Sequence, residues 1–433
     1  MVSLTAYDQA AAPRRVALAR GGQRAVWRLY DTGLALMVLI AAGDLPNRWG
    51  LTSELWMLIY GAALLRILSV WPAYFRLLAR NWTYLLYPAV CLLSVAWSVV
   101  PKVSLVGGIQ ISMSVLIACY LGWRFDPRRL MILAFSTLFF GSVLSMLNYL
   151  SGGAISQPLY SDVGGLLGIY TNKNMLGHYG AMATVLALTF VLTPRGQIPS
   201  ILRAAALVAL VLCPIAVLLS KSMTAILLLP IYLALTLLLN RRRLAGWLRH
   251  GAIAALVLAV ALAPVLMTLV GFDPMAELFA RTGKDATLTG RTELWSIAAG
   301  EISKAPLTGY GFQAFWTAER FESVRFLVLR AGATAPTFHN FIADTGIGTG
   351  LLGIAAICTL VLTSLRRVLR VWRLDGSPLA IGCLITVLMP VNVALVEPYL
   401  YRQHEFMMAW LIMIGVSLGR ARTSPVFMDK FLR

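Results

Sequence analysis

AAALVALVLCPIAVLLSKSMTAILLLPIYLALTLLLN, residues 204–240, contains two apolar runs that are separated only by Lys221 and Ser222. Each run, 204–220 and 223–240, is long enough to cross about 30 Å of hydrocarbon as an α-helix. Backbone groups inside a bilayer must be hydrogen-bonded within their own segment, which a helix achieves. Two spans joined by so short a turn predict a polytopic, all-helical membrane protein.

The composition of the whole chain agrees with this stretch. Hydrophobic residues make up 59% of 433, charged residues only 13%, and the mean hydropathy is +0.77, so no soluble globular class fits. No segment shows the alternation of an outer-membrane barrel. We predict about twelve spans, at residues 29–43, 51–70, 82–99, 103–123, 130–151, 175–193, 204–220, 223–240, 251–271, 340–364, 378–396 and 404–419. The first is short and the fourth is rich in glycine and serine, so eleven or thirteen spans also fit.

Arginine clusters occupy every second connection between these spans, which makes those connections cytoplasmic and places both termini inside. The net charge of +19 is therefore mostly a signal of topology, and nucleic-acid binding is not expected. No removable signal peptide is expected either. The predicted organisation is a cytoplasmic segment 1–28, nine transmembrane helices in 29–271, a periplasmic loop 272–338, three helices in 339–419 and a cytoplasmic tail 420–433.

Neither a cofactor nor a metal site is predicted. The five cysteines lie singly inside predicted spans, without CxxC spacing or a histidine neighbour, and are typical of small buried apolar residues: Cys91, Cys119, Cys213, Cys358 and Cys383. Gly348, Gly350 and Gly353 satisfy GxGxxG, but they lie inside a span and follow no strand. We expect these glycines to serve helix–helix packing.

His339 lies where the long polar loop re-enters a span, in Thr337-Phe338-His339-Asn340-Phe341-Ile342-Ala343-Asp344. A titratable side chain at a lipid–water boundary suggests a base that acts on a lipid-borne substrate. The alternative is a histidine that only caps the helix end. His404 and Glu405, with Glu397 and Arg402 nearby, lie in the last outer connection and are expected at the acceptor entrance.

The periplasmic loop contains seven acids and seven bases between Phe272 and Phe338, so it is built to meet water. Thr289-Gly290-Arg291-Thr292-Glu293-Leu294-Trp295 predicts a capped helix start, and this helix should end at Ala305-Pro306. An arginine in the first turn opposes the helix dipole, which makes sense if Arg291 and the helix N-terminus share a phosphate. Arg281 is a further candidate in the same loop; the alternative for Arg291 is an ion pair with Glu293 or Asp285.

Two lysines lie near the outer boundary against the topological trend. Lys173 stands between Asn172 and Asn174 in Gly168-Ile169-Tyr170-Thr171-Asn172-Lys173-Asn174-Met175-Leu176-Gly177-His178, and Lys221 joins two spans. A diphosphate would explain cations at this depth. Either lysine could instead extend its head group to the interface without binding a ligand.

These motifs together resemble the O-antigen ligase and polysaccharide polymerase superfamily. The resemblance rests on Gly290-Arg291-Thr292-Glu293-Leu294-Trp295, on Pro306-Leu307-Thr308-Gly309-Tyr310-Gly311, on His339-Asn340 before a glycine-spaced helix, and on the segment around Lys173. The chain departs from the pattern at Met223, where the superfamily has an arginine after the second serine. The phosphate-binding role of that arginine therefore either passes to Lys221 or is absent.

The resemblance implies a metal-independent, inverting glycosyltransferase in the bacterial inner membrane, with its active site facing the periplasm. The implied donor is a polysaccharide on undecaprenyl diphosphate, and the implied acceptor is lipid A-core; membrane lipids surround both. His339 and Arg291 would be catalytic, while Lys173, Lys221, Asn172, Asn174, Asn340 and Arg281 would bind the diphosphate or glycan. A polymerase that uses the same donor is the nearest alternative. A flippase is a third, but it would place charges at the bilayer midplane rather than in one outer loop.

Overall fold

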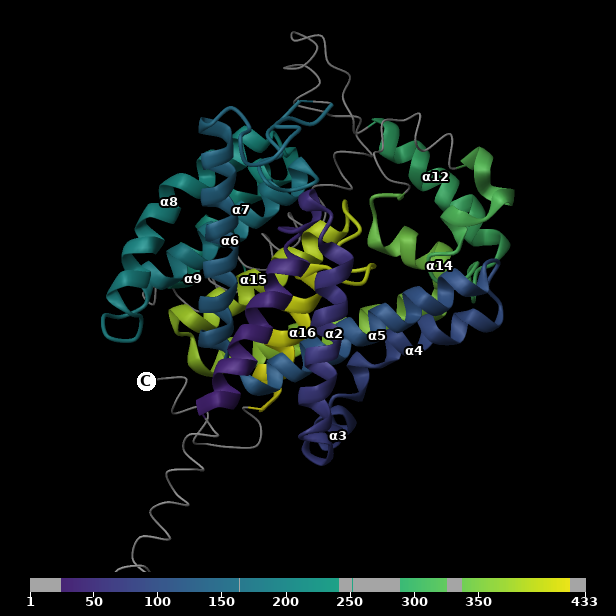
Figure 1. The fold of residues 1–433 in the computed structure, drawn as a ribbon, viewed down its shortest axis with the longest axis horizontal. Helices are drawn as coiled ribbons and strands as arrows, with labels where there is room; N and C mark the ends of the chain where they lie inside the picture. The colour runs from purple at the N-terminus through teal and green to yellow at the C-terminus, as the bar shows by residue number, and fades with distance from the viewer. Residues whose placement is uncertain (1–24, 163, 241–250, 252–288, 325–336, 421–433) are drawn as a thin grey trace, which may run out of the picture.

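The computed structural model describes residues 25–162, 164–240, 251, 289–324 and 337–420. These residues form helices joined by turns and loops, and no β-strand occurs among them. Figure 1 shows a bundle with α8 and α9 at one edge and α12 at the opposite edge, close to α14. Seven helices of the described part are long and apolar enough to cross a membrane, so the chain is an all-helical polytopic membrane protein.

The elements follow the apolar segments of the sequence. In chain order they are a first helix Ala25–Ala42, η1 Asn47–Trp49, α2 Thr52–Leu68, α3 Trp71–Arg80, η2 Trp82–Tyr84, α4 Leu86–Leu93, η3 Ser94–Ala96, α5 Pro101–Arg124, α6 Pro127–Leu150, α7 Lys173–Leu192, α8 Ser200–Ser220, α9 Met223–Asn240, α12 Thr289–Lys304, η4 Phe315–Thr317, η5 Glu319–Phe321, α14 Phe341–Asp375, α15 Pro378–Ala394 and α16 Phe406–Gly419.

The predicted count of twelve spans is not confirmed. The segment 51–70 ends at a bend of 98° between α2 and α3, and the segment 82–99 is divided among η2, α4 and η3. Pro72 in the first turn of α3 favours the start of a new helix at this bend. The predicted span 251–271 falls almost entirely outside the described residues.

Helix α7 is the most buried of the seven long apolar helices in the described part of the chain. In its most apolar stretch 78% of the residues are buried, against 28% in α8, which lies at the edge. Small residues let its neighbours approach closely: a Cβ on Gly177 would lie 2.6 Å from Ser222 Cβ, and one on Gly180 would lie 3.1 Å from Val217. Helix α7 therefore carries the residues around Lys173 on a rigid, buried support.

A buried charge cluster ties the first helix to α2 and α5. The Asp31 carboxylate accepts hydrogen bonds from Arg66 Nε at 3.0 Å, from Arg124 Nε at 2.7 Å and from the Tyr120 hydroxyl at 2.5 Å. Removing one member would leave the others charged and unpaired in a low-dielectric interior, which is costly. The cluster holds these three helices in register.

Helix α14 is broken at Gly350, whose φ of 62° and ψ of −160° are not helical. The segment Pro306–Gly311 lies along the break: Tyr310 N donates to Ile347 O at 2.9 Å, and Gly311 N donates to Gly348 O at 2.9 Å. A Cβ on Gly350 would lie 2.3 Å from Leu307 C. The glycines do permit close packing, as predicted, but the neighbour of Gly350 is a loop of turns instead of another helix.

The described part of the loop that we predicted to be periplasmic has a small core of its own. Side chains from α12, from the following turns and from the start of α14 pack together: Leu294, Ala298, Tyr310, Phe315, Ala318, Phe321, Phe338 and Ile347. Helix α12 covers Thr289–Lys304, which confirms the helix predicted between Thr289 and Ala305. The core places the first turn of α12 on the same side of the bundle as His339.

Candidate functional site

The described parts of four connections meet at one end of the bundle, which we call the loop face: residues 43–51; 151–162 with 164–172; 305–324 with 337–340; and 395–405. Arg48 joins the first two, since its guanidinium donates to the carbonyls of Gln157, Pro158 and Tyr170 at 2.8 to 3.0 Å. Asp44 strengthens this junction by accepting a hydrogen bond from Thr171 N at 3.0 Å. The other connections meet around His339.

His339 faces a buried carboxylate on the loop face. Its Nδ1 lies 3.3 Å from Glu397 Oε2, and the side chain of Glu397 is only 4% exposed, against 21% for His339. A carboxylate beside Nδ1 favours the tautomer that carries its proton there. Nε2 is then the basic nitrogen, so the pair has the arrangement of a general base and the group that orients it.

The backbone around His339 is held in an unusual conformation. His339 has a φ of 51°, in the left-handed region that non-glycine residues rarely adopt. Asp344 supports it by accepting hydrogen bonds from Thr337 Oγ1 at 2.8 Å and from Phe338 N at 3.1 Å. Strain of this kind persists only where surrounding contacts enforce it, and it is common at functional sites.

Asn340, rather than His339, caps α14. Its Oδ1 accepts hydrogen bonds from Ile342 N at 2.9 Å and Ala343 N at 3.2 Å, and its Nδ2 donates to Leu395 O at 2.9 Å. The helix-capping explanation for His339 is therefore wrong, because the neighbouring asparagine takes that role. Asn340 also fastens the start of α14 to the connection that carries Glu397.

Glu397 links His339 to the start of α7. Its Oε1 accepts a hydrogen bond from Asn174 Nδ2 at 2.8 Å, while its Oε2 faces His339. Asn172 caps α7, with its side chain accepting from Asn174 N at 2.8 Å. Asn172, Asn174, Asn340 and His339 thus belong to one group, and Glu397 contacts two of them, His339 and Asn174. Sequence reasoning placed Glu397 in the right connection but did not assign it to the site.

Lys173 lies next to this group, and the turn that carries Lys221 is close by. Lys173 Nζ donates to Gly164 O at 3.3 Å, and Lys221 is exposed at the turn between α8 and α9 with a φ of 50°. A Cβ on Gly165 would meet Lys173 Cδ at 3.0 Å and the carbonyl oxygen of Ser220, the residue before Lys221, at 2.3 Å. The turn that carries Lys221 therefore lies against the same part of the loop face as the Lys173 side chain.

Arg291 lies in the first turn of α12, for which the structure describes the backbone but not this side chain. One turn later, Trp295 Nε1 donates to Phe338 O at 3.0 Å, which connects α12 directly to the residue before His339. Arg281 lies outside the described residues. Within the described part of the chain, no group of three or more His, Cys, Asp or Glu side chains is placed to hold a metal ion.

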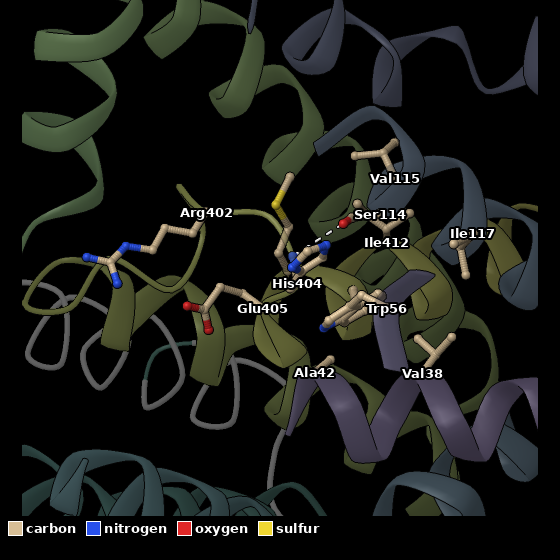
Figure 2. Close-up of a pocket in the computed structure, with 12 residues that line it drawn as sticks. Val38, Ala42, Trp56, Ser114, Val115, Ile117, Arg402, His404, Glu405 and Ile412 are labelled. Carbon is tan, nitrogen blue, oxygen red and sulfur yellow. Dashed lines mark hydrogen bonds between the residues drawn. The ribbon is translucent and has the colours of Figure 1, made fainter. Parts of the chain in front are cut away.

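His404 lies in the same connection as Glu397 but in different surroundings. Its ring stacks on Trp56, with 4.0 Å between ring centroids, and its Nε2 makes a short hydrogen bond with the Tyr60 hydroxyl. Burial lowers the pKa of His404 to about 4, so this ring is neutral at physiological pH. Figure 2 shows His404 and Trp56 side by side at a small pocket, with Arg402 extending away from it.

Comparison with known proteins agrees with this geometry. Residues 205–358 match the family model described as O-Antigen ligase, a segment that contains Lys221, Arg291 and His339. The chain is also 27% identical over 408 residues to the exopolysaccharide production protein ExoQ of Rhizobium meliloti (strain 1021), which covers 89% of this chain and 87% of that protein. The motifs, the match over residues 205–358 and this relative all make the chain similar to the O-antigen ligase and polysaccharide polymerase superfamily.

Proposed function

We propose that the protein is an O-antigen ligase of the bacterial inner membrane, which transfers polysaccharide from undecaprenyl diphosphate to lipid A-core. In this proposal the loop face looks into the periplasm. The observation that carries it is the buried Glu397 carboxylate against Nδ1 of His339, with Lys173 and Lys221 on the same face. A base beside cations suits transfer from a lipid-linked diphosphate, which already is a good leaving group.

The reaction proceeds as a single displacement with inversion at the anomeric carbon. His339 Nε2 takes the proton of the acceptor hydroxyl as its oxygen bonds to the anomeric carbon. The bond from that carbon to the phosphate oxygen breaks, and its electron pair leaves on undecaprenyl diphosphate. Glu397 holds the ring during this step and stabilises the imidazolium that forms. The proton then passes from His339 to water.

Cations on the loop face bind the diphosphate. Lys173 and Lys221 supply point charges, and Arg291 at the first turn of α12 adds a guanidinium and the amides of a helix N-terminus. The hydrogen bond from Trp295 to Phe338 sets the distance between this helix and His339. Arg281 remains a further contact in this proposal.

A polymerase that extends the glycan on the same carrier is the second candidate. It is favoured by the similarity to ExoQ, whose name assigns it to exopolysaccharide production. The donor chemistry and the His339–Glu397 pair would serve both reactions equally, because only the acceptor differs.

Deletion of the gene distinguishes a ligase from a polymerase. Loss of a ligase leaves lipid A-core bare while polymer accumulates on the carrier lipid, whereas loss of a polymerase leaves single repeats on the core. Normal lipopolysaccharide ladders together with a missing exopolysaccharide would contradict the ligase assignment and favour the second candidate.

The orientation of the loop face needs a separate measurement. Gly300 on α12 is exposed, and a Cβ there would have no neighbour within 4 Å, so a cysteine at this position should fold normally. It should react with a membrane-impermeant reagent from the periplasmic side, while a cysteine at Gly376, at the end of α14, should not. The reverse pattern would place the site in the cytoplasm and contradict the proposal.

A further inference from the structure

Arg402 differs from the other arginines of the loop face whose side chains are described. Arg48 donates to three carbonyls, and Arg320 lies over the rings of Tyr310 and Phe321. Arg402 is half-buried, yet within the described part of the chain its guanidinium makes no hydrogen bond, ion pair or ring contact. A partly desolvated charge without a direct partner costs free energy, so it calls for an explanation.

The residues on either side of Arg402 are firmly held. The carbonyl of Tyr401, which is itself buried, accepts a hydrogen bond from the Tyr87 hydroxyl at 3.0 Å. Gln403 Nε2 donates to Gln110 Oε1 at 3.0 Å, and Gln403 Oε1 accepts a short hydrogen bond from Gln313.

His404 completes this support on the other side of Gln403. Its φ of 65° and its stack on Trp56 fix the chain two residues after Arg402. The backbone of Arg402 is thus rigid, while Figure 2 shows its side chain extending away from the packed residues. Because the backbone is already fixed, only the side chain loses conformational freedom when the guanidinium binds a ligand.

The acids near Arg402 are engaged elsewhere. Asp344 accepts from Thr337 and Phe338, and Glu397 accepts from Asn174 and faces His339. Both Arg402 and His339 interact electrostatically with Asp344, so both lie within electrostatic range of this one buried carboxyl group.

Glu405 is the remaining acid close to Arg402. It lies just before α16, and burial raises its pKa to about 8, so the carboxyl is mostly protonated at neutral pH. The positive charge of Arg402 is therefore not cancelled by a contacting carboxylate.

We propose that Arg402 binds the diphosphate of the lipid-linked donor and of the lipid product, beside His339. This inference rests on the proposed transfer from undecaprenyl diphosphate. A single displacement puts the leaving phosphate and the attacking hydroxyl on opposite sides of one carbon, so the anion site and the base must be neighbours. A guanidinium can donate two parallel hydrogen bonds to the oxygens of one phosphate, which a lysine ammonium group cannot do.

The test measures binding of undecaprenyl diphosphate to the purified full-length protein in nanodiscs, together with thermal unfolding. Arg402→Ala should raise the Kd about tenfold to a hundredfold, the effect of losing one or two charge-assisted hydrogen bonds, and Arg402→Lys should recover part of the loss. Arg320→Ala removes the same charge from an exposed position on the loop face and should leave the Kd unchanged.

The outcomes distinguish this inference from the proposed function. If the wild-type protein binds no undecaprenyl diphosphate, the proposed donor is wrong. If it binds and both Arg402 variants bind equally well, only the role of Arg402 is refuted. An unchanged Kd with a raised KM for the glycan-bearing donor would assign Arg402 to an anion on the glycan, which also overturns the proposal. Lower thermal stability with an unchanged Kd would show a purely structural role.

Discussion

Replacement of Glu397 by glutamine should disable the base while leaving the fold intact. In the wild-type protein Glu397 accepts a hydrogen bond from Asn174 at 2.8 Å. The glutamine keeps an oxygen for this bond and turns its NH₂ group toward Nδ1 of His339. An amide NH₂ only donates, so Nδ1 must become the acceptor and the ring proton moves to Nε2. The nitrogen that faces the substrate is then no longer a base.

The expected loss in kcat is about a hundredfold to ten-thousandfold, the usual contribution of a positioned base. This corresponds to about 3 to 5 kcal/mol of transition-state stabilisation. The volume of the side chain and its hydrogen bond to Asn174 are preserved, so the melting temperature should fall by only a few degrees. Glu397→Ala should be at least as slow. A glutamine amide could rotate to turn its oxygen toward Nδ1, whereas alanine has no acceptor to offer.

The assay is single-turnover transfer by purified protein, with donor saturating and protein levels checked by thermal unfolding. Glu405→Gln is a matched control, since it makes the same chemical change in the same connection, at a carboxyl that is already mostly protonated at neutral pH. The reasoning fails if Glu397→Gln and Glu397→Ala both keep turnover within about threefold of wild type.

Three further predictions follow from the same geometry. His339→Ala should lose transfer by at least about a hundredfold but still bind undecaprenyl diphosphate, and retained turnover would remove His339 from the reaction. Gly350→Ala puts a Cβ 2.3 Å from Leu307 C at a φ of 62°, so it should cost about 1 to 3 kcal/mol and lower the melting temperature; Gly61→Ala, with nothing within 4 Å, should not. Glu405 has its pKa raised by burial from 4.5 to about 8, so its unfolded form loses its proton first and the free energy of unfolding should fall across that range of pH. Glu405→Gln should flatten this dependence, and an unchanged slope would show that the carboxyl is solvated.

Local chemistry explains which elements sequence reasoning predicts well. The apolar runs at 204–220 and 223–240 became α8 and α9 with nearly the same ends, because a run of that length in a bilayer has no alternative to a helix. The capped start at Thr289 became α12 for a similar reason, since a helix terminus depends on residues a few positions apart. The division of the segment 82–99 into three short helices was not predicted. An apolar run shows that a segment is buried in the membrane, but not where contacts with other helices interrupt it.

Close approaches between distant segments were also hidden from the sequence. The glycines around Gly350 indicated tight packing, but only the fold shows that Pro306–Gly311 is the neighbour. Small residues allow either a helix or a loop to pack closely against them. Their spacing in the sequence therefore does not predict which segment the partner is.

For the site, the sequence by itself determined which residue types were available at the membrane boundary: His339 and Arg291 in one long connection, and Lys173 between two asparagines in another. Only the tertiary structure decided that Glu397, which lies 58 residues after His339, supplies its carboxylate partner, and that Asn340 donates a hydrogen bond to Leu395 O. The physical reason is the distance along the chain over which each interaction acts. Hydrophobic runs and helix caps act over neighbouring residues, whereas a hydrogen bond between two connections exists only once the intervening helices have packed.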